Sequence, residues 1–258
     1  ADTREADAGV EYAFDDVVNG VGERVGPFAH TVLNTKGEAA LHDGRVGTVG
    51  MWSGLPLPFT FDFYGVQYTR VWADVHGFAS LRRWVGYERS AQAPPAPAID
   101  SDVDRPDAVL APLWADLRQA PRARRSGGPG WAPFEYVDEN TTSGVWQAHF
   151  GVGGPDERFV LQWNVFADGG GAPALGAVPP LQFQLKLFRT GHIEFHYAVA
   201  DAAVLAQLAA SHHFVGIEAH SGTTQCTYVQ NDAAALAAAV TSRTAVRFSP
   251  SADAPALR

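Results

Sequence analysis

Short stretches in which apolar and polar residues alternate make up most of the chain, and Gly, Pro, Asp and Asn separate them. This pattern is typical of an antiparallel β protein. Between residues 181 and 187, Leu or Phe occupies every second position, with Gln182, Gln184 and Lys186 between them. We predict a half-buried strand here, with an apolar face toward a core and a polar face toward water.

A second alternating stretch follows at 192–197, after turn signals at Thr190 and Gly191. Two such stretches joined by a short turn are expected to pair as a hairpin. A further strand is predicted at 159–165, where Phe, Leu, Trp and Val alternate with other residues. Repetition of these strands along the chain indicates a sheet protein with few helices.

Two Ala-rich stretches, 200–210 and 232–242, interrupt the β pattern and predict short surface helices. Asn231 is a candidate N-cap for the second, because its side chain can accept from free amides of a first helical turn. Pro56 and Pro58 restrict their own segment to a strand start or a sheet edge, since proline has no N–H to donate.

These elements predict an all-β fold, an antiparallel, jelly-roll-like β-sandwich with one or two short peripheral helices. We assign residues 1–250 to a single domain and 251–258 to a tail or linker. A composition of 46% hydrophobic and 18% charged residues is that of a globular chain that can bury a sizeable core. No apolar run approaches the roughly 20 residues that a membrane-spanning helix needs.

A formal net charge of −9 argues against nucleic acid as a partner, because phosphate binding needs a basic face. Cys226 is the only cysteine, so the chain forms no intrachain disulfide. The chain begins at Ala1 without a hydrophobic leader, which fits a processed secreted protein. We therefore expect an extracellular or cell-surface location.

His192, Glu194 and His196 lie at alternate positions of a predicted strand, so their side chains project from one face. Two imidazoles and a carboxylate are a plausible ligand set for zinc. Neighbours on one strand diverge, however, and a further element would have to complete the site. We favour a solvated polar face and keep zinc as the alternative.

Asp100, Asp102, Asp104 and Asp107 form an acidic cluster in a predicted loop. Carboxylate oxygens are the ligands that calcium prefers, but the spacing is not that of an EF-hand. A solvated acidic loop is the favoured interpretation, and a calcium site is the alternative. No other cofactor is expected.

Three of the seven tryptophans, Trp84, Trp131 and Trp146, fall near predicted loops or on the outward side of a strand. Exposed aromatic faces can stack on sugars, so these three are the candidate ligand-binding residues. Trp114 and Trp163 lie in strongly apolar segments and are expected to be structural.

Several segments, taken in order over roughly 31–248, resemble the extracellular β module shared by nidogen-type domains, plexin-domain-containing proteins and domains of secreted bacterial subtilase-like proteins. The segments are Leu57–Gly65, His76–Leu81, Leu110–Leu117, Phe159–Val165, Phe183–Phe188, Gly191–Tyr197 and Phe214–Glu218. The resemblance implies a β-sandwich with a role in adhesion, matrix or accessory functions. It transfers no ligand and no catalytic residues, because function depends on sites rather than on folds.

The leading functional hypothesis is thus a non-enzymatic extracellular module for adhesion or assembly, with partner proteins or further copies binding at exposed strand edges. The chain has no G-x-S-x-G elbow and no H-E-x-x-H helix, so we assign no catalytic residues. A carbohydrate-binding module that uses the loop tryptophans is the first alternative. A secreted hydrolase is the second.

Overall fold

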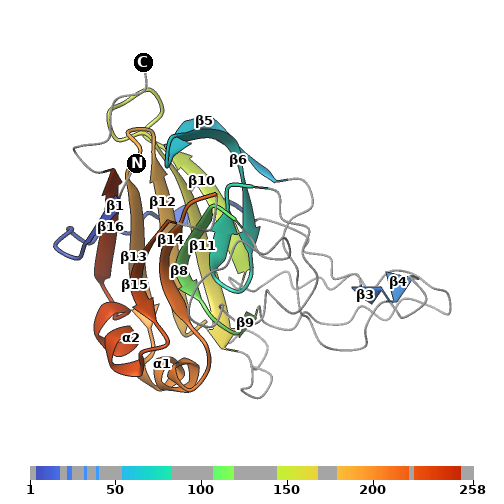
Figure 1. The fold of residues 1–258 in the computed structure, drawn as a ribbon, viewed down its shortest axis with the longest axis vertical. Coiled ribbons are helices and arrows are strands. Elements are labelled where there is room, and N and C mark those ends of the chain that lie inside the picture. Colours follow the sequence, from blue (N-terminus) through green and yellow to red (C-terminus); the bar gives the residue numbers. More distant parts are fainter. Residues whose placement is uncertain are drawn as a thin grey trace.

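A computed structural model of the chain describes residues 4–17, 22–24, 32–33, 39–40, 54–82, 107–118, 144–167, 179–220 and 224–250. Two antiparallel sheets face each other in it and form a β-sandwich, as predicted (Figure 1). The larger sheet contains, in spatial order, β1 (Arg4–Asp7), β16 (Thr244–Pro250), β13 (Ile193–Ala200), β12 (Leu181–Phe188), β11 (Arg158–Ala167), β10 (Gly144–Phe150) and β2 (Glu23–Arg24), with β9 (Leu117–Arg118) paired to β11.

The smaller sheet has six strands. In spatial order these are β15 (Gln225–Gln230), β14 (Phe214–Glu218), β8 (Val109–Trp114), β7 (Phe78–Ser80), β6 (Val66–Asp74) and β5 (Leu55–Phe63). A separate short pair joins β3 (Val32–Leu33) to β4 (Ala39–Ala40).

The core lies between the inner faces of the two sheets, where alternate residues of each strand point inward. Phe195 and Leu185 are opposite each other in the β12–β13 ladder, and both are fully buried. Trp163 stacks on Phe183 with ring centroids 5.4 Å apart, and its indole N–H donates to the carbonyl of Asp74 at 2.7 Å. The structural role predicted for Trp163 is therefore confirmed.

The hairpin predicted from residues 181–197 is present as β12 and β13. Gly191, in the connection, has φ +90°, a conformation that glycine adopts without steric cost. The prediction that Pro56 and Pro58 lie at a strand start or a sheet edge is also confirmed, because β5, which contains them, is the last strand of the smaller sheet. Both prolines point away from the core on the exposed side of the strand.

Both predicted helices are present and lie together at one end of the sandwich as α1 (Ala202–Ala209) and α2 (Ala233–Ala239) (Figure 1). The predicted cap Asn231 is wrong by one residue. The carboxylate of Asp232 accepts from the first-turn amides of α2, whereas Asn231 accepts from the amide of His213 at 3.0 Å. In the described part of the chain, neither helix has the length or the apolar run of a membrane span.

Candidate interaction site on the outer face of the larger sheet

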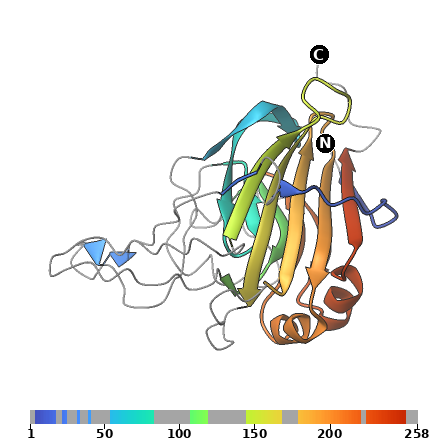
Figure 2. The same cartoon turned by 180° about the vertical axis from the view of Figure 1, so that it is seen from behind.

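Residues 4–17, which we call the N-terminal arm, cover the outer face of the larger sheet. The arm begins as β1, which pairs with β16 at one edge of that sheet. It then crosses β13, β12 and β11 and reaches Val17, which packs on Ala148 and Val160 near the opposite edge. Figure 2 shows this crossing, with the arm in dark blue. The sheet thus holds an extended polypeptide against its outer side.

The polar side of β12 and β13 is consequently not solvated, which corrects the sequence-based expectation. Gln184 and His196 are fully buried, Lys186 is 2% exposed and Glu194 is 5% exposed. His192 is partly exposed, and its Nδ1 lies 3.1 Å from the hydroxyl of Ser249. Alternation along a strand identifies its polar side, but it does not reveal whether another segment covers that side.

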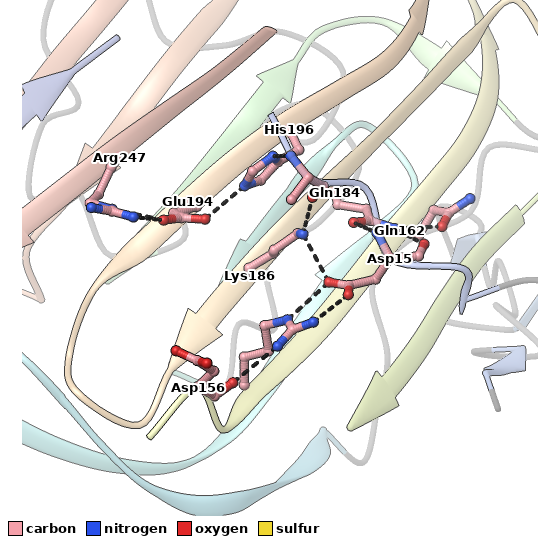
Figure 3. Close-up of polar contacts among 10 residues, drawn as sticks. Asp15, Asp156, Gln162, Gln184, Lys186, Glu194, His196 and Arg247 are labelled. Carbon is pink, nitrogen blue, oxygen red and sulfur yellow. Dashed lines mark hydrogen bonds and ion pairs between the residues drawn. The ribbon is translucent and has the colours of Figure 1, made fainter. Parts of the chain in front are cut away.

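Asp15 of the arm is held by side chains from two strands of the larger sheet. Its carboxylate is 2.8 Å from Nζ of Lys186 on β12, and it also accepts from Nε of Arg158 on β11 at 3.0 Å and from a second guanidinium nitrogen. The amide of Gln184 contacts the Asp15 backbone twice, accepting from its N–H at 3.2 Å and donating to its carbonyl at 2.7 Å. Two strands therefore recognise both the charge and the backbone of this residue (Figure 3).

Ala13 is held through its backbone alone. Its carbonyl accepts from Nζ of Lys186, and its N–H donates to Nδ1 of His196 at 3.3 Å. Because Nδ1 accepts this hydrogen bond, the ring proton of neutral His196 lies on Nε2, which donates to Glu194 at 2.7 Å. Glu194 in turn accepts from Arg247 on β16, so the network continues to the next strand (Figure 3).

Burial and pairing fix the charges in this site. Burial lowers the pKa of His196 below its usual value, although the hydrogen bond to Glu194 partly opposes this effect. Burial alone would raise the pKa of Asp15, but hydrogen bonds from Arg158 and Lys186 outweigh it and the pKa is lowered. The pKa of Glu194 is lowered in the same way, with burial outweighed by His196 and Arg247. Near neutral pH the site therefore contains two carboxylates and a neutral imidazole.

A second layer of amides supports the contacts under the arm. Gln184 donates to the side-chain oxygen of Gln162 at 2.8 Å, and Gln162 donates to Asn164 at 2.8 Å. All three side chains are buried on the same strands as the residues that hold Asp15. This layer orients the Gln184 amide, so the site is preorganised for an extended chain with a carboxylate at one position.

The predicted zinc ligands are not brought together. Glu194 and His196 hydrogen-bond to each other, while His192 contacts Ser249. No group of three His, Cys, Asp or Glu side chains in the described ranges is arranged to hold a metal ion. Glu194 and His196 instead form part of the hydrogen-bond network that holds the arm.

Of the four acidic residues in the predicted calcium loop, Asp100, Asp102 and Asp104 lie outside the described residues. Asp107 lies within them and pairs with Arg82 at 2.8 Å, with both side chains partly exposed. The calcium alternative stays a prediction.

Two candidate sugar-binding residues, Trp84 and Trp131, also lie outside the described residues. Trp146 lies on β10, where it is half-buried and packs against the small cluster that contains Val17. Sugar stacking by the three tryptophans stays a prediction.

One other buried polar pair, Asp74 and His76, has a structural explanation. The Asp74 carboxylate accepts from the backbone N–H of His76 at 2.9 Å and lies 2.7 Å from its Nδ1. Gly77 follows with φ +84°, and a Cβ there would lie 2.0 Å from the carbonyl oxygen of Leu113. The pair and the glycine thus fix a tight turn against β8.

Two facing antiparallel sheets define a β-sandwich, and its outer polar face is covered by an extended segment of the same chain. Residues 29–255 match the family described as NIDO related, and the chain belongs to this family. This result confirms the resemblance to a nidogen-type module and suggests an extracellular kind of domain. Neither the curated proteins nor the solved structures compared with the chain give a match. The arm precedes the matched span, whereas every strand beneath it lies within that span.

Proposed function

We propose that the chain is a non-enzymatic extracellular module for adhesion or assembly, acting through contacts with extended polypeptide segments. The observation that supports this proposal most directly is the set of contacts between the larger sheet and residues 13–15. Side chains from β11, β12 and β13 converge on two backbone carbonyls, two N–H groups and one carboxylate. Such a set recognises the backbone and charge of a peptide.

The sheet edges support the same proposal. The outer edge of β16 has accepted an added strand, because β1 pairs with it from Arg4 to Asp7. In the smaller sheet, β5 is less suited to strand addition, since Pro56 and Pro58 lack N–H donors. We therefore assign the interaction surface to the β16 edge together with the adjoining outer face.

Bead clustering tests the proposal directly. Beads that carry the full chain at high surface density are expected to cluster, and excess soluble chain should disperse them. Beads that stay dispersed, together with a monomeric chain in light scattering at every concentration, would contradict assembly.

The two alternatives have separate readouts. Glycan-array binding that is lost in Trp84→Ala or Trp131→Ala would replace the proposal with a carbohydrate-binding module. Turnover of ester, peptide or glycoside substrates by the purified chain would replace it with a hydrolase.

A further inference from the structure

We infer that the partner of the outer face is the N-terminal arm of a second copy of the same chain, so that copies join by exchanging arms. The inference rests on the proposed assembly function and names its partner. In the described structure the arm occupies the face of its own chain, which shows the contacts that an exchanged arm would make.

The arm can leave without opening the core. None of residues 4–17 belongs to the core between the sheets, and only Arg4 and Val17 are buried. Arg4 donates to the carbonyls of Gly191 and Asp62, and its guanidinium lies over the rings of Phe63 and Tyr64. Val17 packs in a small cluster on the outer face, separate from the core. Release of the arm therefore breaks hydrogen bonds, ion pairs and a few ring contacts and opens the small outer cluster, but it does not separate the two sheets.

The outer face of the larger sheet can also be exposed to water when the arm is released. Its covered side chains include Lys186, Glu194, His196 and Gln184, all of which water can solvate. If the surface beneath the arm were apolar, release of the arm would instead leave an exposed hydrophobic patch. A polar surface beneath the arm is thus suited to an arm that exchanges between copies rather than to one that stays permanently bound.

Exchange restores the contacts between the arm and the sheet, although not the hydrogen bond from the Gly22 N–H to the Val17 carbonyl, which joins the arm to the residues that follow it. In a second copy the arm would form the same β1–β16 ladder and the same Asp15 ion pairs, so the arm–sheet contacts of the two arrangements are the same. The balance depends on concentration, because a tethered arm competes at an effective concentration on the order of millimolar for a short linker. Crowding of copies on a surface would favour exchange.

A disulfide across β1 and β16 can distinguish the two arrangements in the full chain. Glu5 and Ser249 are opposite each other in this antiparallel ladder. Glu5→Cys with Ser249→Cys places two thiols at this pair, in a Cys226→Ser background. Cys226 must be replaced because its sulfur neighbours the N–H of Ala6, next to the new thiol. The serine hydroxyl retains an acceptor at this place.

When the variant is oxidised in dilute solution, we expect an internally bridged monomer on a non-reducing gel. When it is first incubated at a concentration near millimolar, or on beads, and then oxidised, we expect covalently linked dimers and larger species. The diluted, internally bridged form should lose the ability to cluster beads and regain it on reduction. Glu5→Cys in the same background, without Ser249→Cys, reports disulfides that form by random collision.

Internally bridged monomers at every concentration would overturn the inference. So would clustering that is equal for the bridged and the reduced forms, provided that the wild-type chain clusters; in that case copies assemble by another surface. Absence of clustering by the wild-type chain would instead contradict the proposed assembly function itself. Formation of the internal bridge shows in each case that the variant is folded with its arm in place.

Discussion

Strands β11, β12 and β13 each present two faces, and both are buried, but by different means. The inner face packs Leu161, Leu185 and Phe195 against the smaller sheet in a continuous apolar core. The outer face buries Lys186 and His196 beneath a single extended segment. The two faces are both buried, but different events expose them. Release of the arm alone would expose the outer face, whereas the inner face is exposed only when the two sheets separate.

The two interfaces also respond to different conditions. Removal of apolar area from water stabilises the inner interface at about 25 cal/mol per Å² and does not depend on protonation. Each hydrogen bond of the outer interface contributes on the order of 1 kcal/mol net, and those to charged groups depend on pH. The inner interface should govern global unfolding, and the outer one should govern local opening.

Truncation in the core gives the largest expected effect. Phe195→Ala should lower the free energy of unfolding by about 3–5 kcal/mol, because it removes a fully buried ring and leaves a cavity. Urea denaturation followed by tryptophan fluorescence measures this change. Phe195→Leu is the control and should lose less, since it keeps most of the volume. A loss in Phe195→Ala no larger than that of an arm variant would break the distinction between the two faces.

Asp15→Asn should have the next largest effect, and the effect should be confined to the arm. The change keeps the shape of the side chain but leaves buried Lys186 without its carboxylate, at a cost of about 1–3 kcal/mol. Hydrogen exchange at the amides of Ala13 and Asp15 should accelerate while the amides of β12 keep their protection. Glu11→Gln, which removes the same charge from an exposed position of the arm, is the matched control. Acceleration by both variants alike would indicate a general charge effect.

A smaller effect is expected from pH. The lowered pKa of His196 means that the closed arm binds fewer protons than the released arm, so attachment is strongest above the usual imidazole pKa of about 6.5 and weakens as pH falls below it. Protonation converts Nδ1 from an acceptor into a donor that faces the N–H of Ala13. Asp15 and Glu194, whose pKa values are also lowered, add a second loss below their ordinary values of 3.8 and 4.5.

Hydrogen exchange of the arm between pH 7 and 5, corrected for the intrinsic rate, measures the first of these losses. His196→Gln should flatten the response, because the amide can accept from Ala13 but does not titrate. If the exchange of the arm in this variant follows the wild-type profile, another group is responsible.

The smallest effect is expected at the exposed ion pair of Arg82 and Asp107. These side chains are 54% and 30% exposed, so water and salt screen their attraction. Arg82→Ala should change the free energy of unfolding by less than about 1 kcal/mol. A loss of about 1–3 kcal/mol in urea denaturation, the cost expected for Asp15→Asn at the arm, would show that coverage by the arm does not strengthen an ion pair.

Much of the sandwich could be predicted from local patterns. The hairpin of β12 and β13 follows from period-2 alternation around a glycine turn, and the edge position of β5 follows from Pro56 and Pro58. The cap of α2 was misplaced because Asn231 and Asp232 are adjacent and both favour that position. Which of the two accepts from the helix depends on the contact that Asn231 makes with the distant His213.

The covered face could not be predicted, because it depends on contacts between residues far apart in the sequence. Asp15 and Lys186 are 171 positions apart by their numbers, and neither lies in a distinctive motif. The available signal was the alternation of the large side chains Val10, Tyr12 and Phe14 with small or charged residues, which indicates an extended segment with one side on a surface. Even this signal does not identify the surface.

Native-state hydrogen exchange resolved by NMR, at increasing denaturant, tests most directly that the arm is a separable cover. The amides of Ala13 and Asp15 report the arm, and those of Leu185 and Phe195 report the strands beneath it. We predict that the arm amides exchange through a local opening of lower free energy, with little dependence on denaturant. The same free energy and the same denaturant slope at all four amides would contradict this account, because arm and core would then open only together.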